Sequence, residues 1–168
     1  MKPAFDCARA LAIYAGPAEQ LIRDLKYDSR LELGPVMAGM MVVVWQRSMA
    51  FEGLDVVIPV PLHTARRRER GYNQALELAR PVASRFAIPL APQLGVRLRT
   101  TLTQSNLDPR QRQRNVRGAF GIRGKVPASI AIVDDVVTTG ATARAFAQAL
   151  HTAGAREIQL WALARAVH

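Results

Sequence analysis

The chain has 168 residues, of which 49% are hydrophobic and 21% charged, as in a single globular domain with its own core. Its one cysteine, Cys7, excludes an internal disulfide and a zinc site built from thiolates, and it favours a reducing compartment. Residues 1–10 lack the apolar segment of a signal peptide, and the longest dense apolar run, Val36–Trp45, is about half a transmembrane helix. We therefore expect a cytoplasmic protein without membrane insertion.

The net charge of +10 is concentrated in the middle of the chain. Residues 63–117 contain twelve arginines, no lysine and three acidic residues. Guanidinium groups match the geometry of phosphate oxygens, so the preference for arginine points to an anionic partner: a pyrophosphate, a nucleic acid or both. The alternative is a basic surface that is merely solvated.

The first fifty residues predict two helices that pack on the rest of the domain. Residues 1–15 carry no clear signal. Pro17–Tyr27 shows helical spacing of Leu21, Ile22 and Leu25, and Pro35–Met49 predicts a second helix. A methionine-rich stripe is usually core, and a surface that faces a partner is the alternative. The predicted stripe of the second helix comprises Val36, Met37, Met40, Met41 and Val44.

A strand followed by an arginine-rich loop is predicted next. Asp55–Pro59 is apolar and β-branched, and proline ends the strand because it cannot donate to a sheet. In an open α/β sheet, the loop at residues 59–71 then lies at the edge where ligands bind. His63 is expected to have a hydrogen-bonding or structural role rather than an acid–base role. A helix is predicted from Asn73 to about residue 87.

Residues 94–122 predict two short strands around a long basic loop. The strands are expected at residues 94–98 and 118–122. The intervening stretch is polar and too long for a simple connection, which is typical of a lid. Three alternating arginines of this predicted mobile loop, Arg110, Arg112 and Arg114, would point the same way in an extended chain.

The stretch Ser129–Thr142 has the clearest chemistry in the chain. Its apolar run Ile130–Val133 predicts a buried strand, followed by the pair Asp134 and Asp135. A turn rich in hydroxyl groups leads into a helix predicted over residues 142–152. One apolar stripe of that helix comprises Ala143, Phe146, Ala147 and Leu150.

This order suits a phosphorylated ribose. Backbone N–H groups at a helix start favour an anion, and Gly140 allows the backbone to bend close to it. The carboxylates would repel that phosphate, so they suit sugar hydroxyls or Mg²⁺ beside it. The alternative is a surface acidic pair followed by an ordinary capped helix.

Strands at residues 55–60, 130–134 and 157–163, interleaved with helices at residues 73–87 and 142–152, predict an α/β fold with a mainly parallel sheet. We expect one compact domain, in which a helical segment at residues 1–50 packs on a domain at residues 51–168.

Several stretches resemble one known family. Val133–Thr142 is similar to the signature of type I phosphoribosyltransferases, and with the other motifs the chain resembles the ComF (competence protein F) family of that fold. Members are often associated with natural transformation, and they usually begin with a four-cysteine zinc ribbon, which this sequence lacks. The other matching stretches are Lys26-Tyr27, Val60-Pro61-Leu62, Arg66-Arg67, Arg70–Gln74, Gln104, Arg112, Arg114–Val116, Gly118–Phe120, Gly154-Ala155 and Ala164-Arg165.

The resemblance implies a site for phosphoribosyl pyrophosphate. Asp134 and Asp135 would hold the ribose hydroxyls, directly or through Mg²⁺. The 5-phosphate would bind Thr138, Thr139, Gly140, Ala141 and Thr142. The pyrophosphate would bind Pro61, Leu62, Arg66, Arg67, Arg70, Arg110, Arg112 and Arg114. No zinc site is expected.

Two functions remain open from the sequence. The first is a phosphoribosyltransferase that acts on an unidentified acceptor, with no identified general base. The second is a non-catalytic module of the transformation machinery that binds single-stranded DNA or a protein, because fold alone does not fix function. Aromatic residues are only 6% of the chain, so a base-stacking surface is weakly encoded. Oligomerisation is compatible with either function.

Overall fold

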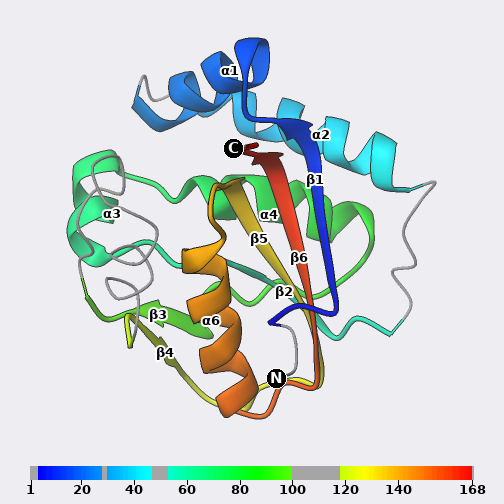
Figure 1. Cartoon of the computed structure of the whole chain (residues 1–168), viewed down its shortest axis with the longest axis vertical. Helices are drawn as coiled ribbons and strands as arrows, with labels where there is room; N and C mark the ends of the chain where they lie inside the picture. Colours follow the sequence, from blue (N-terminus) through cyan, green and yellow to red (C-terminus); the bar gives the residue numbers. More distant parts are fainter. Residues whose placement is uncertain (1–3, 28–29, 47–52, 100–117, 168) are drawn as a thin grey trace.

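The computed structural model describes residues 4–27, 30–46, 53–99 and 118–167, and its centre is a four-stranded parallel sheet (Figure 1). The strand order is β1-β6-β5-β2, with every neighbouring pair parallel. This confirms the predicted α/β fold with a mainly parallel sheet. The strands are β1 (Cys7–Ile13), β2 (Val56–Pro59), β5 (Ser129–Val137) and β6 (Glu157–Arg165).

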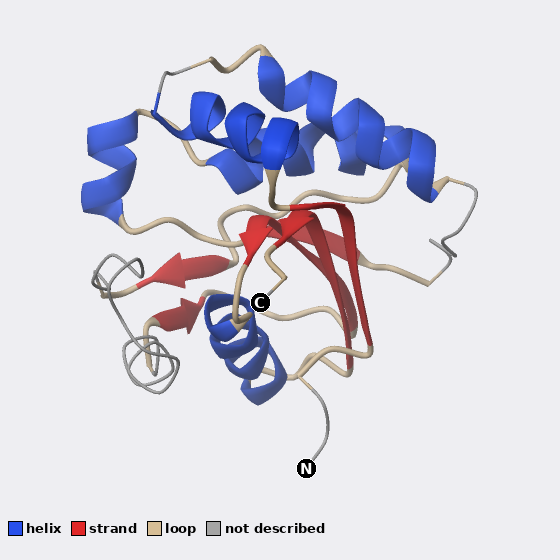
Figure 2. Ribbon diagram, turned by 45° about the horizontal axis from the view of Figure 1, so that its top comes forward, coloured by secondary structure: helices blue, strands red, loops and turns tan. Residues whose placement is uncertain are grey.

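Helices cover both faces of this sheet (Figure 2). One face packs against α1 (Gly16–Tyr27), α2 (Leu33–Trp45) and α4 (Gln74–Arg85). The other packs against α6 (Ala141–Thr152) and a small antiparallel sheet of β3 (Gly95–Arg97) and β4 (Phe120–Ile122). A short helix, α3 (Thr64–Arg70), lies beyond the end of β2 (Figure 1).

The central strand β5 explains why the core has two halves, one on each face of the sheet. Successive side chains of a strand point to opposite faces. Ala131 and Val133 of β5 therefore pack in the helical layer of α1, α2 and α4, whereas Ile130 and Ile132 pack with α6. All four side chains are fully buried, as the apolar run predicted.

Strand β1 was missed by the sequence analysis. Its sequence, Cys-Ala-Arg-Ala-Leu-Ala-Ile, mixes small and charged residues, and it forms an edge of the sheet with no fully buried residue. It pairs with β6 at the far end of the chain. The segment predicted as helical at residues 1–50 therefore also supplies a strand to the main sheet.

Helix α2 presents a different face to the core from the one predicted. Of the predicted stripe, Met37 and Met41 are buried, but Val36, Met40 and Val44 are 55%, 48% and 51% exposed. The helix is apolar on all sides, so its sequence does not specify a face. The buried face is instead set by a small residue that allows close packing. A Cβ on Gly34 would lie 3.1 Å from Cβ of Glu77, so the Gly34 side of α2 approaches α4 closely.

Part of the predicted arginine-rich loop is a helix. His63 accepts a hydrogen bond from the backbone N–H of Ala65 through Nδ1 at 3.2 Å, which caps α3 and confirms a hydrogen-bonding role for this histidine. Gly71, with φ of 82°, ends the helix. The basic loop at residues 100–117 lies outside the described residues. Among the helices of the described residues, none is long and apolar enough to cross a membrane.

Candidate functional site

The turn between β5 and α6 forms a tight corner at the carboxyl edge of the sheet. Gly140 has φ of 71°, and a Cβ there would lie 2.9 Å from Nη1 of Arg144, so the corner favours glycine. Helix α6 begins directly afterwards, and Phe146, Ala147 and Leu150 anchor it in the core. The predicted order of strand, turn and helix is confirmed.

Side chains within the corner stabilise the turn. The hydroxyl of Thr139 accepts a hydrogen bond from the backbone N–H of Ala141 at 3.4 Å. Arg144 donates to the carbonyl of Thr139. The N-terminus of a helix carries a partial positive charge, and this guanidinium adds to the positive potential where an anion is expected. The sequence analysis missed Arg144, although a basic residue in the first turns of a helix is a usable signal.

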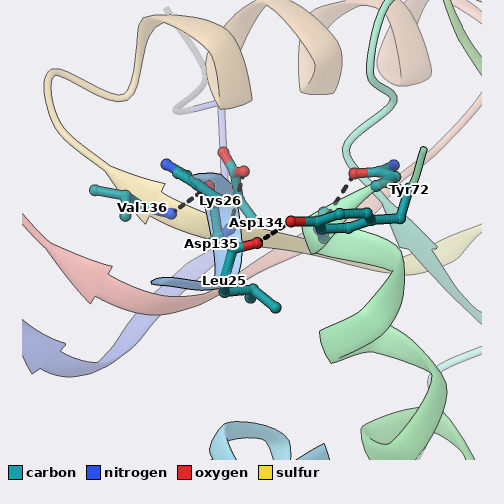
Figure 3. Close-up of polar contacts among 8 residues, drawn as sticks. Leu25, Lys26, Tyr72, Asp134, Asp135 and Val136 are labelled. Atoms are coloured by element: carbon teal, nitrogen blue, oxygen red, sulfur yellow. Dashed lines mark hydrogen bonds and ion pairs between the residues drawn. The ribbon is translucent and has the colours of Figure 1, made fainter. Parts of the chain in front are cut away.

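The acidic pair lies inside β5, two residues before the strand ends, rather than after the strand. Asp134 accepts the backbone N–H of Asp135 at 3.0 Å through Oδ1. Asp135 accepts the backbone N–H of Val136 at 2.7 Å through Oδ1, and its Oδ2 lies 2.8 Å from Nζ of Lys26 (Figure 3). Lys26 comes from the last turn of α1. The N-terminal helices therefore contribute to this edge of the sheet.

The two carboxylates have opposite electrostatic environments. Burial and the neighbouring charge of Asp135 raise the pKa of Asp134 to about 8. Burial also disfavours ionisation of Asp135, but the Lys26 ammonium outweighs it and lowers the pKa of Asp135. The same ion pair raises the pKa of Lys26 against the opposing effect of burial. Asp135 is thus a fixed anion, and Asp134 is the carboxylate whose charge can change near neutral pH.

An arginine that the sequence analysis did not single out lies near Asp134. Arg97 of β3 stacks over the ring of Phe120, with its Cζ 5.5 Å from the ring centroid. Burial lowers the pKa of Arg97, the charge of Asp134 raises it, and Arg66 lowers it further. Arg97 is therefore electrostatically linked both to the acidic pair and to the arginines of α3.

The arginine-rich segment begins at the same edge of the sheet. The N–H of Val60 donates to the carbonyl of Val133 at 2.8 Å, which ties the end of β2 to β5. Asn73 caps α4 by accepting from Ala75, and its Nδ2 donates to the carbonyl of Val60 at 3.1 Å. Helix α3 itself has no buried residue, and Arg66 pairs with Glu69 at 3.3 Å.

The structure thus places two groups of predicted residues at one edge of the sheet. The carboxylates and the corner follow β5 directly: Asp134, Asp135, Thr138, Thr139, Gly140, Ala141 and Thr142. The residues after β2 begin beside them: Pro61, Leu62, Arg66, Arg67 and Arg70. The predicted pyrophosphate ligands Arg110, Arg112 and Arg114 lie outside the described residues. Lys26, Arg97 and Arg144 are additional charged residues at this edge.

A parallel sheet that carries an acidic pair, a hydroxyl-rich corner and a helix start at its carboxyl edge defines an α/β protein with a candidate anion site at that edge. No family model matches the chain. Curated relatives do match it over most of its length, and through them the chain belongs to the competence protein F (ComF) family.

Competence protein F of Haemophilus influenzae is 31% identical over 172 residues, which cover 98% of this chain and 75% of that protein. DNA utilization protein YhgH of Salmonella typhimurium is 36% identical over 156 residues, or 90% of this chain and 69% of that protein. YhgH of Escherichia coli K12 is 35% identical over 159 residues, with coverages of 92% and 70%.

Solved structures are similar only at a low level. The purine phosphoribosyltransferase of Pyrococcus horikoshii is 17% identical with a TM-score of 0.44, covering 78% of this chain and 86% of that one. The UMP synthase of Leishmania donovani is 17% identical with a TM-score of 0.41, covering 83% of this chain and 22% of that one. Family membership therefore follows from the sequence relatives.

Proposed function

We propose that this protein binds phosphoribosyl pyrophosphate, with the 5-phosphate at the corner Thr138–Thr142 and the ribose hydroxyls at the acidic pair. The observation that carries the proposal is the corner itself: Gly140 in the left-handed region, hydroxyl side chains and the start of an anchored helix directly after two carboxylates. Helix starts bind phosphate through backbone N–H groups and the helix dipole. Carboxylates accept hydrogen bonds from a diol.

Mg²⁺ fits this site through one of the carboxylates. Mg²⁺ prefers oxygen ligands and usually binds one or two carboxylates together with substrate phosphates. Both oxygens of Asp135 have partners, one of them the ammonium of Lys26, whereas no salt bridge of the described residues holds Asp134. Asp134, which carries a proton near neutral pH, would release that proton and hold the ion together with oxygens of the ligand. When bound, Mg²⁺ supplies positive charge that stabilises a departing diphosphate.

The same arrangement suits transfer of the phosphoribosyl group. The bond from ribose C1 to the pyrophosphate oxygen breaks, the bonding electron pair leaves with the pyrophosphate, and an acceptor atom bonds to C1. Arg66, Arg67 and Arg70 carry the positive charge that the departing pyrophosphate needs. No residue is assigned as general base, and the acceptor is not identified by the site.

Calorimetric titration tests this proposal. Phosphoribosyl pyrophosphate with Mg²⁺ should bind the unmodified protein, and Asp134→Asn should weaken binding by about tenfold or more, because an amide cannot replace a carboxylate toward Mg²⁺. Inorganic phosphate alone should bind both proteins equally. The proposal is wrong if the unmodified protein gives no heat of binding.

A second function is favoured by the basic segment. The relatives are named for competence and for DNA utilization, and we propose that this protein works in DNA uptake. Twelve arginines lie between residues 63 and 117, and four of them are in helix α3, which has no buried residue. They provide the charge to bind the backbone of single-stranded DNA. In this alternative the ligand would control partner binding without turnover.

Fluorescence anisotropy of a labelled oligothymidylate distinguishes the two proposed functions. DNA binding predicts an affinity that falls steeply with salt, and Arg110→Ala/Arg112→Ala/Arg114→Ala should reduce both the affinity and the slope of its salt dependence. Binding that is absent, or insensitive to salt, would exclude the second function and leave the first untouched.

A further inference from the structure

The two carboxylates of β5 differ in how firmly they are held. Both oxygens of Asp135 have partners: the backbone N–H of Val136 at 2.7 Å and Nζ of Lys26 at 2.8 Å. Asp134 accepts the N–H of Asp135 at 3.0 Å and also shares a side-chain hydrogen bond with the carboxyl group of Asp135. Among the salt bridges of the described residues, Lys26 holds Asp135 and none holds Asp134, so Asp134 is the less constrained of the two.

The two side chains have different charged neighbours. Residues 130 and 132 face the α6 layer, and residues 131 and 133 face the layer of α1, α2 and α4. This alternation does not continue past the acidic pair, because Val136 also packs against the layer of α1, α2 and α4. Asp135 pairs with Lys26 of α1, whereas Asp134 interacts electrostatically with Arg97 of β3.

Lys26 is itself held in place by the fold. Leu25, the preceding residue, is fully buried, and its carbonyl accepts a hydrogen bond from the hydroxyl of Tyr72 (Figure 3). Tyr72 lies between α3 and α4, directly before the cap of α4. The side chain of Lys26 is 21% exposed and that of Asp135 13%, so the pair is largely shielded from water. Removing one member of a shielded pair lowers the free energy of unfolding substantially, because the remaining charge would be buried without a partner.

We propose that Lys26 is a positioning residue that holds Asp135 away from the ligand and leaves Asp134 as the carboxylate that contacts ribose and Mg²⁺. Lys26 also compensates the charge of Asp135, so that two adjacent carboxylates are tolerated beside a phosphorylated ligand. This assignment rests on the proposed binding of a ribose phosphate. It gives the N-terminal helix α1 a part in the ligand site, through a residue outside the acidic pair, the corner and the arginine-rich segment.

Lys26→Met tests the assignment by calorimetry with ribose 5-phosphate and, separately, inorganic phosphate. The freed, charged Asp135 should repel the ligand and compete with Asp134, weakening ribose 5-phosphate binding by about tenfold, since one unpaired buried charge disturbs the site strongly. Binding of inorganic phosphate, which needs the corner alone, should change by less than about threefold. Lys26→Arg should restore most of the ribose 5-phosphate affinity.

The control is Arg23→Met on the same helix. Arg23 is exposed and lies 4.0 Å from Glu19, so its loss should leave both affinities unchanged. Equal weakening for both ligands in Lys26→Met would indicate a general structural role and would overturn the assignment.

A double variant separates positioning from folding. Lys26→Met/Asp135→Asn removes both charges, so it leaves no unpaired charge even if Lys26→Met alone does not fold. If Asp134 is the contacting carboxylate, the double variant should recover most of the ribose 5-phosphate affinity, whereas Asp134→Asn should not. A double variant as weak as Asp134→Asn would show that Asp135 contacts the ligand and would overturn the inference.

Failure of the proposed function gives a different result. If the unmodified protein does not bind ribose 5-phosphate, the proposed function and this inference are both wrong. If it binds and Lys26→Met binds equally well, this inference alone is wrong.

Discussion

The two arms of the candidate site are built in opposite ways. The corner after β5 lies between a buried strand and a helix anchored by fully buried Phe146 and Leu150. Helix α3, after β2, has no buried residue and is fixed mainly by its caps at His63 and Gly71. Both arms start at the same sheet edge, because the end of β2 is hydrogen-bonded to β5.

This contrast suggests a division of labour. A phosphate bound through backbone N–H groups requires a fixed backbone, and the corner provides one because core packing holds both sides of it. Attraction of a pyrophosphate requires charge more than exact backbone geometry, and α3 provides arginines on an exposed surface. Changes in the corner should therefore affect stability and binding together, whereas changes in α3 should affect binding alone.

The largest expected effect is on the anchor of the corner. Phe146→Ala should lower the free energy of unfolding by about 3–5 kcal/mol, because it leaves a cavity beside β4 and β5. Arg67→Ala in α3 is the matched change in the other arm and should stay within about 0.5 kcal/mol. Urea unfolding followed by circular dichroism measures both. Similar decreases in the free energy of unfolding for the two variants would contradict the difference between the two arms.

The next effect tests the backbone of the corner. Gly140→Ala should cost about 1–2 kcal/mol and weaken phosphate binding, because a side chain is strained at φ of 71° and would meet Arg144. Gly39→Ala is the control: its Cβ would point into open space in the middle of α2, so it should stabilise the protein by roughly 0.5–1 kcal/mol. Equal changes in the free energy of unfolding for the two variants would show that residue 140 accepts a side chain without strain.

Acid–base behaviour sharpens the comparison between the two carboxylates. The folded protein holds a proton on Asp134 up to about pH 8, whereas an unfolded chain releases it near pH 4. The folded state thus binds more protons over this range, so this residue should make the free energy of unfolding decrease as pH rises from about 4 to 8. Asp134→Asn should flatten that decrease in urea unfolding at several pH values. The same slope in both proteins would contradict the assigned pKa.

The smallest effect on stability belongs to the basic arm. Arg66→Ala/Arg67→Ala/Arg70→Ala should leave the free energy of unfolding within about 1 kcal/mol, because surface pairs such as that between Arg66 and Glu69 contribute little. The same variant should bind pyrophosphate more weakly and with less dependence on salt. Calorimetry at two salt concentrations tests this, and an unchanged affinity would remove α3 from the site.

Local patterns were sufficient to predict the corner. The apolar run of β5, the stripe of α6 and the need for glycine at residue 140 are each encoded within a few neighbouring residues, and the structure has all three. The sequence did not predict that β5 continues to Val137, because the two acidic residues interrupt the apolar run. The strand continues because its backbone still pairs with β6 beyond them.

Long-range contacts account for what could not be predicted. Edge strand β1 forms only by pairing with β6, about 150 residues later, and its small and charged residues give no strand pattern. The face of α2 depends on its close contact with α4. The pairing of Lys26 with Asp135 likewise joins two segments that have no sequence pattern in common.

Amide chemical shifts during a titration with ribose 5-phosphate test the central claim most directly. If the corner holds the phosphate through its backbone, the largest shifts should occur at the N–H groups of Gly140, Ala141 and Thr142, with Asp134 next and the amides of α3 little changed. Shifts confined to α3, or an unresponsive corner with a bound ligand, would contradict the account.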